Sequence, residues 1–414
     1  MRKHRPRTVA AGARSIVVAH PSPDVYGSDR QLVESVAGLV EHGWHPTVML
    51  PADGPLRAIL ERQGAHVVVR DFPVLRKGLL RPRAFLGFLL RAPVTVGRLR
   101  SVLRRSGACA VYVNTLTIPL WVIAARLARL PVLCHSHEAE QVARPVQVAL
   151  AAPLLLAQVV VANSEATRSV LTTSVGRLSR RTVVVHNGVP DSGPPTPLRQ
   201  RTGDDELRLA LVSRLSPRKG VHVALDAVAA LREQGRSVTL DICGSTFPGY
   251  EWYERQLRNQ VRDRGLSDVV TFHGYVHPTR PLLDTADVVL VPSFGESFGN
   301  VAVEAMLAGR PVVASAVQGL AEVIDDGHTG ILVEPDSAEA IASAVATLGD
   351  DFDLAARLAL NGRHDAVARF GLTPYRTRIA ALLSRVTQAG RSPDDRGLRP
   401  SRSPSVRPEP AQSR

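Results

Sequence analysis

Aromatic residues and cysteines are both scarce in this chain. Phe, Trp and Tyr make up only 4% of the 414 residues, so a hydrophobic core has to be built mainly from Val, Leu, Ala and Ile. The three cysteines, Cys109, Cys134 and Cys243, lie far apart and form no C-x-x-C pair. This spacing argues against a disulfide framework and against a zinc site, and it fits a reducing compartment such as the cytoplasm.

Long uninterrupted apolar runs are absent as well. The apolar stretches Leu116–Cys134 and Val146–Ala162 are both interrupted by prolines and polar residues. Neither reaches the roughly 20 apolar residues that a membrane-spanning helix needs, so we expect buried helices and strands there. The basic N-terminus is followed by only a short apolar run, Ile16–Ala19, which favours a first strand over a signal sequence.

Acidic residues are missing from one long segment. No Asp or Glu lies between Asp71 and Glu138, and residues 1–190 carry 25 Lys/Arg against 10 Asp/Glu. Such a face attracts nucleic acid, anionic lipid or phosphorylated small molecules, although a solvated arginine-rich surface would look the same. The basic residues that cluster in this segment are Arg76, Lys77, Arg81, Arg83, Arg91, Arg98, Arg100, Arg104 and Arg105.

The order of apolar and polar segments predicts two domains. Short apolar runs bounded by Gly, Pro and Asn alternate with helical patterns, which is typical of a parallel sheet with helices on both faces. The alternation stops in a Gly/Pro/Asp-rich linker and then restarts. We therefore expect an α/β fold with two doubly wound, Rossmann-like domains facing each other across a cleft. The expected division is a flexible basic N-terminus (1–14), a first domain (15–190), a linker (191–206), a second domain (207–373), a last helix packing back on the first domain (374–386) and a disordered Ser/Pro/Arg-rich tail (388–414).

The densest motif is the segment Val291–Ala314, which reads as strand, loop, helix, stop and strand. Gly295 and Gly299 flank the loop and let the backbone approach a ligand closely. A helix is expected from about Gly299 to Ala308, stopped by Gly309. Its first turn, near Phe298–Val301, offers unpaired N–H groups to a diphosphate.

Two carboxylates frame this helix start. Glu296 lies in the loop and Glu304 lies about two turns into the helix. Because a carboxylate can accept two hydrogen bonds from a vicinal diol, the pair could hold a sugar and a ribose at opposite ends of one diphosphate. Taken singly, Glu296 could instead be a helix-capping acid and Glu304 a surface residue.

A basic turn follows the predicted strand Leu207–Val212. Within Ser213–Gly220, Arg214 and Lys219 could reach one anion from a turn shaped by Pro217. Negative charge develops on a diphosphate when its bond to a sugar breaks, and preorganised cations can stabilise it. A basic turn on its own is more often simply solvated.

These motifs together resemble the family 4 retaining glycosyltransferases of GT-B fold. The resemblance rests on Pro-Ser-x-x-Glu-x-Phe-Gly followed by Glu-Ala-Met within residues 292–306, with Arg214 and Lys219 upstream. It extends from about Ser15 to Val386. Further matching elements are Tyr26–Arg30, Asn163–Glu165, His186–Val189 and Gly319–Asp336.

The resemblance implies a role for each matching residue. Arg214 and Lys219 would bind the donor diphosphate, Glu304 the ribose and Glu296 the donor sugar. Phe298, Gly299, Asn300 and Val301 would supply backbone contacts. Gly27 and Ser28 stand where the family usually has a Gly-Gly pair, so the serine leaves the shape of that loop open. His137 matches a histidine that faces the reacting sugar, although it could also be a satisfied polar residue at a strand end. His135 lies two residues away and competes for the role.

The resemblance also implies the overall chemistry. The family is thought to retain anomeric configuration by front-face attack, in which the leaving phosphate takes the acceptor proton. No side-chain nucleophile is then needed, and no metal is expected, because the only Asp-x-Asp, at Asp351–Asp353, looks like a solvated helix start. The co-substrate would be a nucleoside-diphosphate sugar, and the acceptor a saccharide or a lipid-linked saccharide. A cytoplasmic protein, peripheral at the inner face of the membrane through the Arg76–Arg105 segment, would fit this chemistry.

Two other functions are consistent with parts of the sequence. A nucleotide-sugar epimerase of the same fold would keep a similar donor site. An anion- or nucleic-acid-binding protein could use the basic segment, but only Phe85 and Phe88 interleave with it, and nucleic acid is not expected as a partner. The donor base, expected near His273–Val276, and the donor sugar and acceptor stay open.

Overall fold

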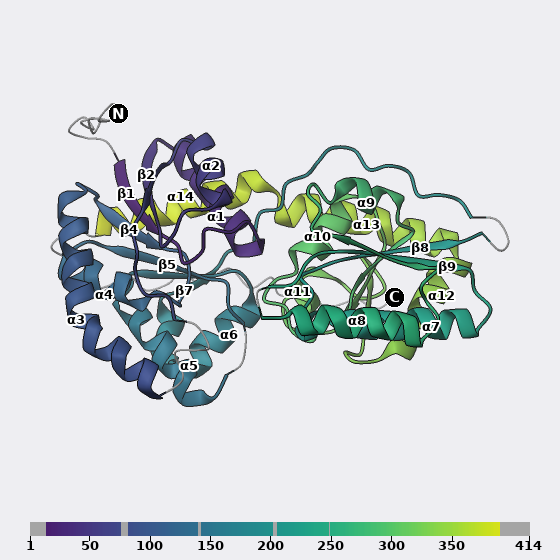
Figure 1. The fold of residues 1–414 in the computed structure, drawn as a ribbon. Coiled ribbons are helices and arrows are strands. Elements are labelled where there is room, and N and C mark those ends of the chain that lie inside the picture. The colour runs from purple at the N-terminus through teal and green to yellow at the C-terminus, as the bar shows by residue number, and fades with distance from the viewer. Residues whose placement is uncertain (1–13, 76–81, 140–141, 202–204, 248, 390–414) are drawn as a thin grey trace, which may run out of the picture.

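The computed structural model describes residues 14–75, 82–139, 142–201, 205–247 and 249–389. In this part the chain forms two α/β domains, each built on one parallel sheet (Figure 1). The predicted pair of doubly wound domains is therefore confirmed. The predicted basic N-terminus up to Ala13, the tail beyond Ala389, and Arg76, Lys77 and Arg81 of the basic segment lie outside the described residues, as does the side chain of Arg83.

The N-terminal domain has a seven-stranded parallel sheet in the order β3-β2-β1-β4-β5-β6-β7. The strand order reverses direction between β1 and β4, which places a crevice at the carboxyl ends of these strands. The strands are β1 (Arg14–Ala19), β2 (Trp44–Leu50), β3 (His66–Val69), β4 (Ala110–Val113), β5 (Val132–Ser136), β6 (Val159–Ala162) and β7 (Thr182–Val184). The helices are α1 (Gly27–Glu41), α2 (Pro55–Arg62), α3 (Pro82–Arg105), α4 (Pro119–Leu127), α5 (Arg144–Ala151) and α6 (Glu165–Ser174).

The C-terminal domain repeats this plan with six strands in the order β10-β9-β8-β11-β12-β13. Its strands are β8 (Leu207–Val212), β9 (Val238–Cys243), β10 (Val270–Gly274), β11 (Val288–Val291), β12 (Val312–Ser315) and β13 (Ile331–Val333). The helices that follow are α7 (Val221–Glu233), α8 (Glu251–Asp263), α9 (Arg280–Thr285), α10 (Asn300–Leu307), α11 (Leu320–Val323), α12 (Ala338–Asp350), α13 (Phe352–Phe370) and α14 (Leu372–Ala389).

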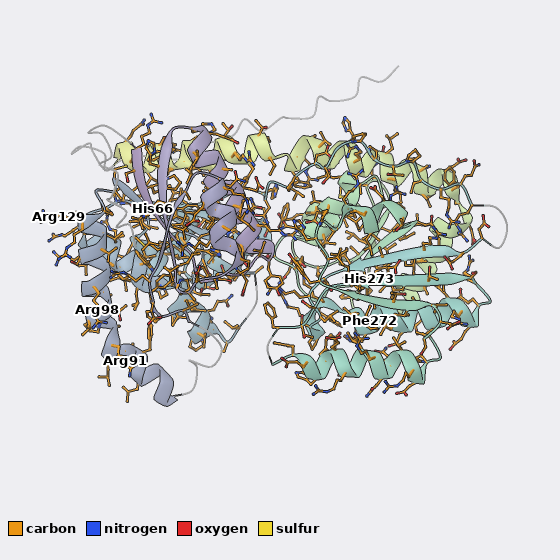
Figure 2. All side chains as sticks on the ribbon, turned by 45° about the horizontal axis from the view of Figure 1, so that its top comes forward. His66, Arg91, Arg98, Arg129, Phe272 and His273 are labelled. Atoms are coloured by element: carbon orange, nitrogen blue, oxygen red, sulfur yellow. The ribbon has the colours of Figure 1, made fainter. Side chains whose placement is uncertain are left out.

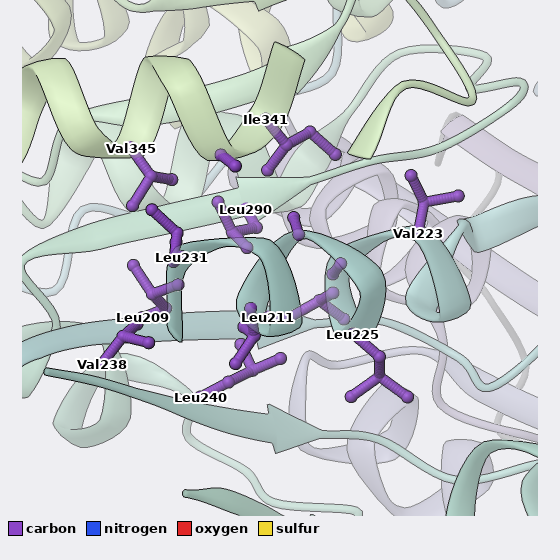
Figure 3. Close-up of a cluster of buried hydrophobic side chains, with 14 of the residues drawn as sticks. Leu209, Leu211, Val223, Leu225, Leu231, Val238, Leu240, Leu290, Ile341 and Val345 are labelled. Carbon is purple, nitrogen blue, oxygen red and sulfur yellow. The ribbon is translucent and has the colours of Figure 1, made fainter. Parts of the chain in front are cut away.

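Both sheets are apolar on both faces, which explains the continuous apolar runs of their strands. In β11, Val288 and Leu290 belong to one buried cluster, and Val289 and Val291 belong to the cluster on the opposite face. Figure 3 shows part of the first cluster, where side chains of α7 and α12 pack together against those of the sheet. Alternate residues of a strand point to opposite faces, so a strand covered by helices on both sides needs apolar residues throughout.

The C-terminal helix α14 leaves the second domain and packs on the first (Figure 1). Its residues Tyr375, Ile379 and Leu383 are buried in the same cluster as the α1 side of the N-terminal sheet. The helix is longer at both ends than the predicted 374–386. It can begin before Pro374 because the proline falls in the first turn, where no intrahelical N–H donor is required. The chain thus crosses between the domains twice, and Val189 N–H of the first crossing donates to Phe370 O at the second, at 2.8 Å.

The two long apolar stretches form ordinary elements of the N-terminal domain. Leu116–Cys134 contains α4 and most of β5, and Val146–Ala162 contains most of α5, a short 3-10 turn and β6. Within the described ranges, every helix is too short or too polar to cross a membrane.

Candidate active site

A cavity of about 490 Å³ lies between the two domains, at the carboxyl ends of both sheets. Residues that follow β5, β8, β9 and β11 line it, as expected for ligand sites in doubly wound folds. All the predicted site residues line this cavity: Gly27, Ser28, His137, Arg214, Lys219, Glu296, Phe298, Gly299, Asn300, Val301 and Glu304.

The start of α10 is shaped to present backbone to the cavity. Gly299 is the N-cap residue with φ of 110°, and a Cβ there would lie 2.6 Å from a methyl group of Leu320. No side chain caps the helix, so its first N–H groups stay available to an anion. The ring of Phe298 is buried against His186 and Phe370, which anchors the loop from behind.

Glu304 projects from α10 into the cavity. Its carboxylate accepts a hydrogen bond from Thr279 Oγ1 at 3.1 Å and lies 3.8 Å from Nη1 of Arg30, which comes from the other domain. Burial raises the pKa of Glu304 above its usual range, because the charged form loses hydration. Glu304 is therefore not an exposed surface residue, and its carboxylate lines the cavity, where it could accept hydrogen bonds from a diol.

Glu296 is held at the opposite end of the loop. Its carboxylate is ion-paired with the ammonium group of Lys219. Its backbone N–H donates to Gln318 Oε1 at 2.9 Å, and its carbonyl accepts from Gly319 N–H at 3.0 Å. Glu296 does not cap α10, which excludes the helix-capping interpretation of this residue.

The basic turn after β8 brings three cations to the cavity, and each is held differently. Lys219 pairs with Glu296, and Arg218 donates to Gly295 O at 3.2 Å. The guanidinium of Arg214 lies 3.6 Å from the ring centroids of both Tyr26 and Phe247. Burial lowers the pKa of Arg214 to about 10, so it stays charged at neutral pH.

The two candidate histidines lie in different surroundings. His135 is fully buried, and its Nδ1 is 2.8 Å from Tyr112 Oη. His137, two residues further, lines the cavity. Burial, aided by nearby His20, lowers the pKa of His137 to about 3, so its ring is neutral at neutral pH.

A chain of buried polar groups holds the His137 ring. Its Nε2 lies 3.0 Å from Asn114 Oδ1, and the amide nitrogen of Asn114 lies 3.1 Å from His20 Nδ1. Nε2 of His20 is 2.8 Å from Asp29 Oδ1. Because the Asn114 oxygen can only accept, Nε2 of His137 carries the hydrogen and Nδ1 keeps its lone pair.

The Gly27-Ser28 pair lies in the first turn of α1. Tyr26 is the N-cap residue with an extended backbone, so Ser28 is helical and needs no glycine conformation. A Cβ at Gly27 would meet only the Asn300 side chain, at 3.7 Å. The serine therefore leaves the shape of this turn unchanged.

The sequence did not indicate several contacts that cross the cleft. Arg30 Nη2 lies 3.0 Å from His277 Nδ1, and Asn187 donates to Asn300 Oδ1 at 2.9 Å. These partners are separated by more than a hundred residues, so only the tertiary fold brings them together. Of the expected base segment His273–Val276, Tyr275 and Val276 line the cavity, whereas His273 bonds Asp241 at 2.6 Å and lies elsewhere in the domain (Figure 2).

The described residues contain no group of three or more His, Cys, Asp or Glu side chains placed to hold a metal ion. Asp351, in the Asp-x-Asp sequence, caps α13 by accepting from Leu354 N–H at 2.8 Å.

Comparison with known proteins connects this geometry to a family. The model described as "Glycosyl transferases group 1" matches residues 206–351, and the model described as "Glycosyltransferase Family 4" matches residues 25–192. A D-inositol 3-phosphate glycosyltransferase of Corynebacterium glutamicum (strain R) is 39% identical over 36% of this chain and 37% of its own length. A glycogen synthase of Mycobacterium tuberculosis is 33% identical over 51% of this chain and 50% of its own. The matched region thus spans half or less of the length of these curated relatives.

Among solved structures, Anabaena HepE in complex with UDP-glucose superimposes with a TM-score of 0.75. It is 26% identical, and the match covers 90% of this chain and 99% of HepE. Thermosynechococcus elongatus sucrose-phosphate synthase shares the fold at 21% identity, with a TM-score of 0.68 over 91% of this chain and 100% of its own. With both domains matched, the chain belongs to the group 1, family 4 glycosyltransferases of GT-B fold.

Proposed function

We propose that this protein transfers a hexosyl group from a nucleoside-diphosphate sugar to an acceptor, with retention of anomeric configuration and without a metal ion. The observation that carries the proposal is the segment Glu296–Glu304. It brings two carboxylates and an uncapped helix start to one cavity, opposite Arg214. Such a set of groups suits the three parts of the donor: nucleoside, diphosphate and sugar.

In this mechanism the start of α10 and Arg214 bind the diphosphate, and Lys219, which lines the same cavity, shares it. Glu304 holds the ribose diol, and Glu296 holds hydroxyl groups of the donor sugar. The bond between C1 of the sugar and the phosphate oxygen breaks, and the cations stabilise the charge left on the diphosphate. The acceptor hydroxyl forms the new C1–O bond on the same face and gives its proton to the departing phosphate.

His137 fits a supporting role in this scheme. The His137 imidazole is neutral, its Nε2–H donates to Asn114 Oδ1, and its Nδ1 carries a lone pair. That nitrogen is buried, so the neutral ring would meet the donor sugar through the part of the residue that lines the cavity. The role is to orient the sugar, because a ring with such a low pKa is a poor proton donor or acceptor at neutral pH.

UDP is the nucleotide we propose for the donor, because HepE was crystallised with UDP and with UDP-glucose. A thermal-shift panel of UDP, GDP, ADP and dTDP tests this directly. A ligand at 100 times its dissociation constant adds about 2.7 kcal/mol to the stability of a protein that binds it only when folded. Stabilisation by UDP supports the proposal, and stabilisation by none of the four contradicts it.

Incubation with UDP-sugar alone separates transfer from epimerisation. An epimerase converts the donor without an acceptor, whereas a transferase gives at most slow hydrolysis. Rapid formation of a second UDP-sugar would therefore reject the transferase proposal in favour of the epimerase.

For the acceptor, we propose a lipid-linked saccharide met at an anionic membrane surface. Helix α3 contains no acidic residue, and Leu86, Leu90 and Val94 are exposed on it. Arg91 and Arg98 lie on the outer flank of the same helix (Figure 2). Apolar and cationic side chains on one exposed helix suit the headgroup region of anionic lipid.

Co-sedimentation with phosphatidylglycerol-containing vesicles tests the membrane proposal. The double variant Arg91→Glu/Arg98→Glu should lose most vesicle binding, since each basic residue near such a surface contributes about 1 kcal/mol. The double variant Arg255→Glu/Arg262→Glu, at exposed positions on α8 of the other domain, serves as the charge-matched control. Equal binding of the double variant and the parent would contradict this acceptor-side proposal.

A further inference from the structure

The guanidinium of Arg214 sits in a notch whose two walls come from different domains. One wall is the ring of Tyr26, which precedes α1 in the N-terminal domain, and the other is Phe247, which follows β9 in the C-terminal domain. The ring centroids are 5.5 Å apart and their planes meet at 54°. Cation–π attraction is strongest in such a desolvated setting.

In this notch the N–H donors of the Arg214 guanidinium remain available for a ligand. In the part of the chain that the structure describes, no carboxylate forms an ion pair with Arg214 and no acceptor receives a hydrogen bond from its guanidinium. Lys219, on the same turn, is already paired with Glu296. Arg214 is therefore held by its π face while its N–H groups remain available to an anion in the cavity.

Tyr26 is itself fixed without help from Arg214. Its backbone N–H donates to Asp29 Oδ2 at 2.9 Å, and its ring lies edge-on to Tyr275, with centroids 6.2 Å apart. The ring is thus a fixed wall against which the long arginine side chain can be ordered. An arginine that is already ordered loses less conformational entropy when it binds phosphate.

We propose that Tyr26 is a positioning residue for the diphosphate: with Phe247 it holds Arg214 so that the guanidinium edge meets the phosphate oxygens. Since Tyr26 and Arg214 belong to different domains, the anion site is complete only when the two domains are together. The inference rests on the proposed nucleotide-sugar binding, but it concerns an anion site that can be tested without a nucleoside.

Isothermal titration calorimetry on the full chain with pyrophosphate, UDP and uridine provides the test. Tyr26→Ala should weaken pyrophosphate and UDP about tenfold and leave uridine unchanged. Tyr26→Phe keeps the ring face and should bind all three like the parent. Tyr250→Ala is the matched control. The Tyr250 ring belongs to the same aromatic cluster, with its centroid 6.5 Å from that of Phe247, but it does not contact Arg214.

Phe247→Leu removes the other wall from the opposite domain and should reproduce the loss even if Tyr26→Ala fails to fold. Pyrophosphate binding by Tyr26→Ala or Phe247→Leu within twofold of the parent would overturn the inference, as would a parent that binds no pyrophosphate. A parent that binds pyrophosphate but no nucleoside diphosphate would reject the proposed function. The Tyr26 series would still decide the positioning role in that case.

Discussion

At the scale of single residues, the two glutamates of the donor segment should separate binding from transfer. Glu304→Ala removes a carboxylate proposed to hold the ribose and should weaken UDP between about tenfold and a hundredfold, as expected for hydrogen bonds to a charged group. Glu296→Ala should spare UDP affinity and reduce transfer. Calorimetry and UDP-release assays measure the two effects, with Glu334→Ala as an exposed control. A Glu296→Ala enzyme as active as the parent would contradict its assignment.

Asn114 is the residue on which the state of His137 depends. In the parent, His137 should not titrate above about pH 4, because burial keeps its pKa near 3. Asn114→Asp places a negative charge 3.0 Å from His137 Nε2 and should raise that pKa by at least about one unit.

Nitrogen-15 histidine NMR, with the His137 signal assigned from a His137→Gln variant, measures this shift. Asn259→Asp, on the exposed face of α8, is the control and should leave the signal unchanged. An unshifted His137 signal in Asn114→Asp would show that the amide does not govern the ring.

Whether a site residue could be predicted from the sequence depends on how far it lies, along the chain, from its partners in the site. Glu296, Gly299 and Glu304 fall within one strand–loop–helix unit, so their convergence follows from local geometry and could be predicted. Tyr26 and Arg214 come from different domains, and no local pattern connects them. His135 and His137 could be told apart only once the structure put one in the core and the other in the cavity.

At the scale of the element, α11 depends on a close approach to the donor loop. A Cβ at Gly319 would lie 2.5 Å from Phe298 Cα and from Ser297 O. Gly319→Ala should therefore push the loop and α11 apart, destabilise the protein by about 1–3 kcal/mol and weaken UDP binding.

Gly97, inside α3, has no atom within 4 Å of its Cβ position, so Gly97→Ala should be neutral or stabilising by up to about 1 kcal/mol. Urea unfolding compares the two variants. Equal unfolding free energies for Gly319→Ala and Gly97→Ala would contradict this prediction, because they would show that the donor loop accommodates the extra Cβ without loss of stability.

The C-terminal end of α10 followed a local stop in the sequence. Helix α10 ends at Leu307, just before Ala308 and the glycine Gly309, as the motif predicted. The bounds of α14 differ from the predicted range because the length of this helix depends on its packing against α1. An isolated amphipathic pattern does not encode that contact.

At the scale of the whole molecule, Glu322 joins the domains. This residue of α11 accepts the backbone N–H groups of Glu165 and Ala166, at the start of α6, at 2.8 and 2.7 Å. Burial alone would raise the pKa of Glu322, but hydrogen bonds from His186 and these two N–H groups outweigh it and hold the pKa below its usual range. The negative carboxylate also complements the positive end of the helix dipole.

The stabilisation by Glu322 should therefore depend on pH. A carboxyl group with a lowered folded-state pKa stabilises fully above its unfolded value of about 4.3 and loses that stabilisation as the pH falls through the folded value. Glu322→Gln should cost about 1–2 kcal/mol at pH 7 and progressively less in acid.

Urea unfolding from pH 7 down to pH 3 measures the difference between variant and parent. Glu165→Gln, which disrupts only an exposed pair with Arg168, is the control. If the difference in unfolding free energy between Glu322→Gln and the parent stays constant with pH, the Glu322 carboxylate is not the source of a pH-dependent stabilisation.

The double crossing of the chain between the domains has a mechanical consequence. Because Val189 N–H donates to Phe370 O where the crossings meet, the two covalent connections are tied together at one point. Two tethers at a common point permit a swing about an axis through that point but resist translation and shear. Because Tyr26 and Arg214 come from different domains, such a swing changes the distance between them and so opens or closes the anion site.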